Sequence, residues 1–147
     1  MKQFHIFDTN SYQNFIREAI HRRSRQGRGE LLRLANYIGI HTSTLSQVLA
    51  LKKQFTLDQA CLVSEFFGLN ELETRYFLLM VSRDRAGTAL LKQNFEKQLS
   101  EIKNNSTELK NLLNTDRPLT QEEKAIFYSN WYYTAIWALT SIEGFNS

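Results

Sequence analysis

Short polar side chains that can hydrogen-bond to nucleic-acid bases gather in one segment of the sequence. They are Thr42, Ser43, Thr44, Ser46 and Gln47. The spacing of Leu45, Val48 and Leu49 predicts a helix from about Thr42 to Ala50, in which these apolar residues face inward and the polar set faces outward. Gln bonds bidentately to adenine, and Ser and Thr serve either type of base. The segment therefore carries the chemistry for reading base edges; an ordinary polar helix face is the alternative.

Basic residues surround this segment. Residues 1–55 hold nine Lys and Arg against three Asp and Glu, a net charge of +6, whereas residues 56–147 hold nine against twelve, a net charge of −3. Such asymmetry favours a polyanionic partner for the first third of the chain, although a solvated arginine-rich surface explains it equally well. The best candidates for phosphate contact, from their places beside the predicted helix, are Arg28, Arg33, His41, Lys52 and Lys53. For Arg22, Arg23 and Arg25, a solvated helix end is an equal explanation.

A second predicted helix, from about Glu30 to Ile38, must position the polar one, and Gly39 ends it. Seven positions in this pair hold the residue types that a helix-turn-helix requires: Leu34, Ala35, Ile38, Gly39, Ile40, Leu45 and Val48. Ala35 is small where the two helices cross, Gly39 makes the turn, and the other five form a small core. The pattern predicts a helix-turn-helix over residues 30–49.

Residues 34–49 resemble the motif of phage-repressor-type (Xre/Cro) DNA-binding domains. The chain as a whole is similar to an uncharacterised bacterial family of transcriptional regulators. Its members join such a domain to a C-terminal domain that opens with Phe-Tyr-Ser-x-Trp-Tyr, here residues 127–132, and continue beyond the length of this chain. The resemblance implies a five-helix repressor-like domain and double-stranded DNA as the partner.

Two residues depart from the motif. His41 stands where Ser commonly caps the second helix of the pair, and it is a poorer N-cap; it either reaches a phosphate or base, or is merely tolerated. Leu51 stands where Gly often follows that helix. A positive φ at Leu51 would cost about 1–2 kcal/mol, so we expect a rebuilt loop here.

Further helices are predicted from their capping signals. The first begins near Asn10, and the capping boxes Thr56–Gln59 and Asn70–Glu73 open the fourth and fifth. Gly68 ends the fourth, and the fifth runs through about Val81.

Beyond this point, residues 84–113 predict a long amphipathic helix that breaks or frays at 104–106. Another capping box at residues 120–123 opens an aromatic segment that is apolar on every side. We therefore expect an all-α protein with a helix-turn-helix domain at 1–82 and a connecting helix at 83–117. Residues 118–147 are an aromatic helical segment or the start of a truncated second domain.

Several classes of protein are disfavoured. The sequence has no HExxH, GxSxG or P-loop motif, its three histidines lack ligand spacing, and Cys61 has no partner cysteine. We expect no catalytic or metal site, no cofactor and no enzymatic activity, with Cys61 as a small buried residue. No signal peptide and no run of about 20 apolar residues is present, which favours a cytoplasmic protein with no membrane partner.

Two functions remain from different classes. The first is a sequence-specific regulator that binds double-stranded DNA as a homodimer, paired through residues 84–142, with half-sites about one helical turn apart. The alternative is a protein-interaction module that keeps the helix-turn-helix fold without binding DNA, in which residues 121–142 dock on a partner. Single-stranded RNA binding would need exposed aromatic residues near the basic segment, where only Tyr37 occurs.

Overall fold

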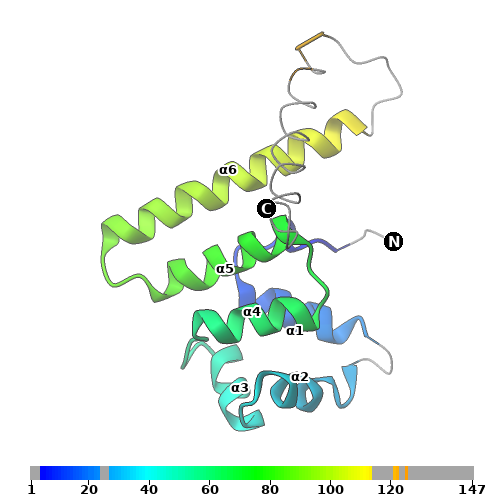
Figure 1. Cartoon of the computed structure of the whole chain (residues 1–147), viewed down its shortest axis with the longest axis vertical. Helices are drawn as coiled ribbons and strands as arrows, with labels where there is room; N and C mark the ends of the chain where they lie inside the picture. The colour runs from blue at the N-terminus through cyan, green and yellow to red at the C-terminus, as the bar shows by residue number, and fades with distance from the viewer. Residues whose placement is uncertain (1–3, 24–26, 114–120, 123–124, 126–147) are drawn as a thin grey trace, which may run out of the picture. The chain divides into compact units, whose positions relative to one another are not determined.

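The computed structural model describes residues 4–23, 27–113, 121–122 and 125. Over these residues the chain forms one 3-10 helix and six α-helices with no strand, so the all-α prediction is confirmed for them (Figure 1). The chain divides into two compact units, Met1–Leu99 and Ser100–Ser147. Two residues of the expected capping box, 120 and 123, lie outside the described residues. The Phe-Tyr-Ser-x-Trp-Tyr stretch at residues 127–132 also lies outside them.

The N-terminal elements are η1 (Ile6–Asp8) and α1 (Tyr12–His21). The Ser11 side chain caps α1 by accepting a hydrogen bond from the Asn14 N–H at 3.3 Å, so the helix begins just after the predicted start. Tyr12, Phe15 and Ile16 of α1 are buried in the core.

The next two helices are α2 (Glu30–Ile38) and α3 (Thr42–Leu49), and they agree with the predicted boundaries to within one residue. Only residues 39–41 join them. Gly39 has a φ of 84°, a left-handed conformation that favours glycine, and the N–H groups of Gly39 and Ile40 both donate to the Ala35 carbonyl. The sharp turn predicted at Gly39 is therefore confirmed.

Two capping boxes start α4 (Leu57–Phe66) and α5 (Glu71–Arg85), as the sequence predicts. Gly68, with a φ of 65°, follows the end of α4. However, α5 continues to Arg85, past the predicted end near Val81.

The last described helix, α6 (Ala89–Leu113), is continuous through residues 104–106, so the predicted break there is wrong. Asn and Ser each cost only a few tenths of a kcal/mol in a helix interior, too little to interrupt a helix of 25 residues. Among the described residues, no helix is both long and apolar enough to cross a membrane.

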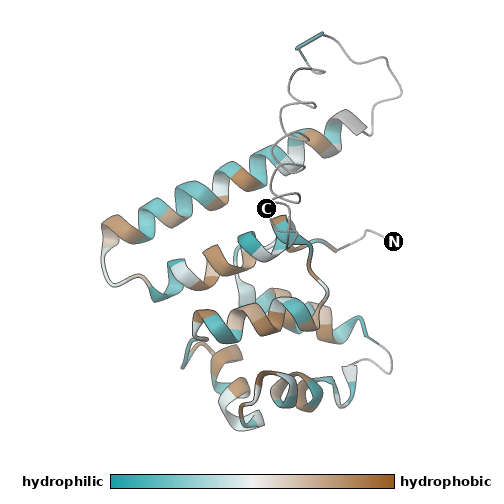
Figure 2. Ribbon diagram, viewed as in Figure 1, coloured by the Kyte–Doolittle hydropathy of each residue, from teal (hydrophilic) through white to brown (hydrophobic). Residues whose placement is uncertain are grey.

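In the first unit, α2 packs on α3 and α4, α4 packs on α5, and α1 contacts α3 and α5 (Figure 1). Figure 2 shows the apolar segments of α4 and α5 that contribute to this core. Tyr12, Phe55 and Phe77 are fully buried, and the Tyr12 ring meets each of the other two at a centroid distance of 5.8 Å.

Cys61 is exposed, which contradicts the prediction that it is buried. The apolar run in which it lies is helical, and the core side of α4 is taken by Ala60, Val63 and Ser64. At about 100° per residue, Cys61 turns away from that side.

Candidate nucleic-acid interface

The two sides of α3 differ sharply in burial. Leu45 is 0 %, Val48 1 % and Leu49 8 % exposed, so one side is fixed in the core. The opposite side presents the predicted base-reading residues: Thr42, Ser43, Ser46 and Gln47 are exposed and Thr44 is half-buried. No exposed side chain of α3 is acidic or large and apolar.

The core that orients α3 consists of the residues singled out in the sequence. Leu34 and Ala35 are completely buried, Ile38 is buried and Ile40 is half-buried. The absence of a larger side chain at Ala35 allows α2 and α3 to approach, and these two helices are in contact. The orientation of the polar side of α3 is thus set by close packing rather than by a loop.

The N-terminus of α3 begins at His41, which is exposed and whose side chain makes no capping hydrogen bond. The prediction of a poor cap at this position is confirmed. The first-turn N–H groups of α3 are not capped by that side chain, and their partial positive charge suits an anion.

The C-terminus of α3 contradicts the rebuilt loop expected at Leu51. Leu51 adopts a φ of 65° and is the one non-glycine residue with positive φ in the described part of the chain. Its N–H donates to the Val48 carbonyl at 3.1 Å, and the Lys52 N–H donates to the Gln47 carbonyl at 2.9 Å. These are the two bonds of a Schellman cap, which satisfies the last carbonyls of a helix and so offsets the strain. Lys52 and Lys53 follow directly and are both exposed.

At the start of α2, arginines surround a buried carboxylate that the sequence did not single out. Glu30 is 5 % exposed and forms ion pairs with Arg33 and, at 3.0 Å, with Arg23. The hydrogen bond from Arg33, and then that from Arg23, holds the pKa of Glu30 below its ordinary value. Arg23 also donates to the Phe66 carbonyl and lies over the Phe66 and Phe67 rings at 4.5 and 5.0 Å.

These contacts distinguish among the arginines of the first third of the chain, of which Arg28 and Arg33 were the predicted phosphate contacts. Arg23 is bonded to Glu30 and to the Phe66 carbonyl, and Arg22 pairs with Glu18 at 2.8 Å. The Arg33 side chain is ion-paired yet 66 % exposed, so part of its guanidinium remains accessible. Arg28 is exposed, and Arg25 lies outside the described residues.

Sequence reasoning missed Arg85, the last residue of α5. It lines a surface hollow together with four residues of the loop after α3, namely Leu51, Lys52, Lys53 and Gln54. Because more than 30 positions separate Lys53 from Arg85, local spacing carries no signal of their proximity.

Other kinds of site find little support in the part of the chain that the structure describes. No group of three His, Cys, Asp or Glu side chains there is placed to hold a metal ion. Tyr37 is 45 % exposed, but its ring makes an edge contact with Phe66.

Comparison of the chain with protein-family models, with curated proteins and with solved structures gives no significant match.

Proposed function

We propose that this protein is a sequence-specific regulator of transcription that binds double-stranded DNA through a repressor-like helix-turn-helix made of α2 and α3. The observation that carries the proposal is the contrast between the two sides of α3. One side is locked in the core by Leu45, Val48 and Leu49, and the other exposes only hydroxyl groups and an amide. A rigidly held helix with such a surface suits the major groove, where these groups hydrogen-bond to base edges.

In this proposal the residues that contact DNA fall into two classes. The base-reading residues are Thr42, Ser43, Thr44, Ser46 and Gln47, and the phosphate-binding residues are Arg28, Arg33, His41, Lys52 and Lys53. The second class positions the helix on the duplex but carries no sequence information. Lys52 and Lys53 are its strongest members, because they lie in the loop just after α3 and no described carboxylate pairs with either.

A single helix of this size makes few base contacts, so we further propose that the regulator acts as a homodimer on two half-sites. The segment 84–142 is the proposed pairing region. Within its described part, Leu90 is 73 % and Leu91 44 % exposed at the start of α6, an apolar surface of the kind that a partner covers.

The test is selection of bound sequences from a random duplex pool, followed by binding measurements on two pairs of variants. Gln47→Ala is expected to cost about 1–3 kcal/mol of discrimination at one base pair, whereas Asn14→Ala, at an exposed amide on α1, leaves the selected sequence unchanged. Lys52→Ala is expected to weaken binding to all sequences alike and to reduce the log–log salt slope by about 0.9, and Arg75→Ala, at an exposed arginine on α5, serves as its control.

The alternative, a protein-interaction module, predicts a different outcome. Absence of any duplex binding at about 50 mM salt would favour it, because sequence-independent attraction to phosphates is strongest at low salt. Binding that neither Gln47→Ala nor Lys52→Ala alters would show that α3 is not the helix in the groove.

A further inference from the structure

The hollow beside the C-terminal end of α3 brings three cationic side chains together from two distant segments. Lys52 and Lys53 come from the loop after α3, Arg85 comes from the end of α5, and Leu51 and Gln54 complete the lining. The hollow is shallow and open to solvent, with a volume of about 410 Å³, so a phosphate group can reach it from outside.

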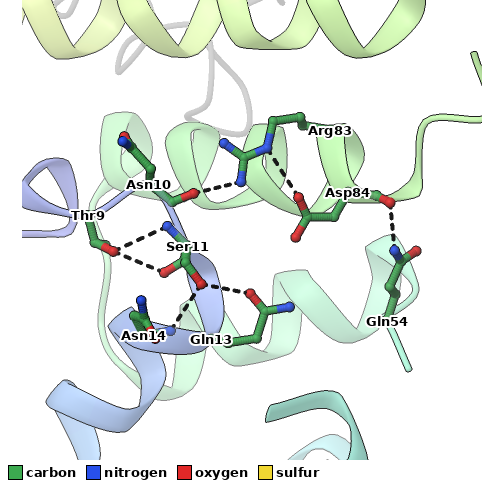
Figure 3. A network of polar contacts seen from close by, with 8 residues as sticks. All are labelled: Thr9, Asn10, Ser11, Gln13, Asn14, Gln54, Arg83 and Asp84. Carbon is green, nitrogen blue, oxygen red and sulfur yellow. Dashed lines mark hydrogen bonds and ion pairs between the residues drawn. The ribbon is translucent and has the colours of Figure 1, made fainter. Parts of the chain in front are cut away.

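Two hydrogen bonds hold the loop against the end of α5. The Gln54 Nε2 donates to the Asp84 carbonyl at 2.6 Å, and the Arg85 Nη1 donates to the Phe55 carbonyl at 3.0 Å (the Gln54–Asp84 bond is drawn in Figure 3). Both bonds cross 30 residues of sequence, and together they fix Arg85 next to Lys52 and Lys53. The Arg85 guanidinium is thus placed before any ligand arrives, which lowers the entropic cost of binding.

The nearest acidic side chain in sequence is directed elsewhere. The Asp84 carboxylate accepts a hydrogen bond from the Arg83 Nε at 3.1 Å, and Arg83 also donates to the Asn10 carbonyl (Figure 3). Within the described chain, no carboxylate forms an ion pair with Lys52, Lys53 or Arg85. The described carboxylates therefore leave the positive charge of Lys52, Lys53 and Arg85 without an ion-pair partner.

The donors available to an anion here are side chains. The backbone N–H groups of Leu51, Lys52 and Lys53 already bond to the carbonyls of Val48 and Gln47. Arginine carries five N–H donors in a planar fork, and Arg85 spends one of them on Phe55. The remaining donors match the geometry of a phosphate, while the two lysines act as point charges.

We propose that this hollow binds one phosphate group of the DNA backbone, with Arg85 as a phosphate-binding residue that acts together with Lys52 and Lys53. The proposal rests on the proposed function, because it names the duplex contacted by α3 as the source of the phosphate. It adds a contact from α5 to an interface otherwise built from α2, α3 and the loop after α3.

The experiment measures binding of the full chain to a random duplex over a range of salt concentrations. Arg85→Ala is expected to weaken binding several-fold and to reduce the log–log salt slope by about 0.9, as one lost phosphate contact does. Arg85→Lys restores the slope but only part of the affinity, because lysine keeps the charge and lacks the fork. Arg75→Ala, at an exposed arginine on α5 outside the proposed DNA interface and the proposed pairing region, is the matched control and leaves both quantities unchanged.

A second variant separates the placement of charge from its amount. Gln54→Ala keeps all three cations but removes the bond to Asp84, so we expect lower affinity with an unchanged salt slope. Thermal unfolding of each variant, followed by circular dichroism, checks that the fold is retained. If Arg85→Ala does not fold, the comparison of Arg85→Lys with the original chain decides: equal affinity for the two overturns the role of the fork.

Duplex binding by the chain and phosphate binding by Arg85 are tested by different outcomes. If the chain binds duplex and Lys52→Ala lowers the salt slope while Arg85→Ala does not, the role of Arg85 is overturned and the proposed function stands. If the chain binds no duplex, the proposed function fails, and the DNA phosphate with it. A titration with inorganic phosphate, followed by the NMR shifts of Arg85, tests for a free anion. Such shifts in a chain that binds no duplex would identify a free anion as the ligand and overturn the DNA assignment.

Discussion

Two groups of basic residues adjoin the helix pair, and the structure uses them in opposite ways. At the start of α2, Arg23 and Arg33 close around the buried Glu30 carboxylate. Beyond the end of α3, Lys52, Lys53 and Arg85 line a hollow without an ion pair to any described carboxylate. The first group neutralises charge within the fold, whereas the second leaves charge available to a ligand. A count of basic residues in a sequence therefore overstates the positive charge that is available to a partner, because some of these residues are ion-paired within the fold.

Removal of Arg23 is the strongest test of this comparison. Arg23→Ala deprives Glu30 of one partner and removes the stacking on Phe66 and Phe67, so the free energy of unfolding is expected to fall by about 2–3 kcal/mol. Urea denaturation measures this loss. The salt slope of duplex binding should remain that of the original chain, because Arg23 is committed to the core.

Arg28→Ala is the matched control, since Arg28 is exposed. Its free energy of unfolding should lie within about 0.5 kcal/mol of the original value. If Arg23→Ala is equally harmless, or if it lowers the salt slope as much as Lys52→Ala, the contrast between the two groups is wrong.

Lowering the pH should weaken the contacts that Arg23 and Arg33 make with the Glu30 carboxylate. The pKa of Glu30 is held below its ordinary value of 4.5 by the hydrogen bonds from Arg33 and Arg23. A carboxyl whose pKa is lower in the folded state contributes stability above the unfolded pKa, and that contribution is lost as the pH falls through the folded value. We expect Glu30→Gln to flatten the loss of stability that sets in as the pH falls through the ordinary value of 4.5, measured by urea denaturation at each pH. An unchanged pH dependence in this variant would contradict the role given to Glu30.

The smallest expected change in stability is at Leu51, the residue before Lys52. Leu51→Gly relieves a positive φ but adds freedom to the unfolded chain, so a net stabilisation of about 0.5–1 kcal/mol is expected. Thermal denaturation measures the gain, and little packing is lost because the side chain is 73 % exposed. Leu51→Ala is the control: alanine keeps a Cβ and should bring no comparable gain. Equal stabilisation by both variants would locate the effect in the exposed apolar surface rather than in the backbone.

Local signals in the sequence predict the helices well. Thr56 with Gln59 and Asn70 with Glu73 start helices as expected, and Gly39 and Gly68 end them, because caps depend on neighbours within a few residues. The same local reasoning failed at Leu51, where two cap hydrogen bonds outweigh the strain of a leucine in a glycine conformation.

The candidate site was only partly predictable. Burial on α3 follows helical periodicity, so its exposed polar residues were identified from the sequence. The partners of charged side chains depend on packing between distant segments, and periodicity does not report it. For this reason neither the pairing of Arg23 and Arg33 with Glu30 nor the approach of Arg85 to Lys53 was foreseen.

The bonds from Gln54 to Asp84 and from Arg85 to Phe55 also set the smallest piece of chain that can carry the hollow. Each closes a loop of about 30 residues, a cost in chain entropy that the packing of α4 on α5 helps to offset. A peptide of α2, α3 and the following loop would retain both lysines but lack the third cation. The assembled charge therefore belongs to the folded unit through the end of α5, and it disappears when that unit unfolds.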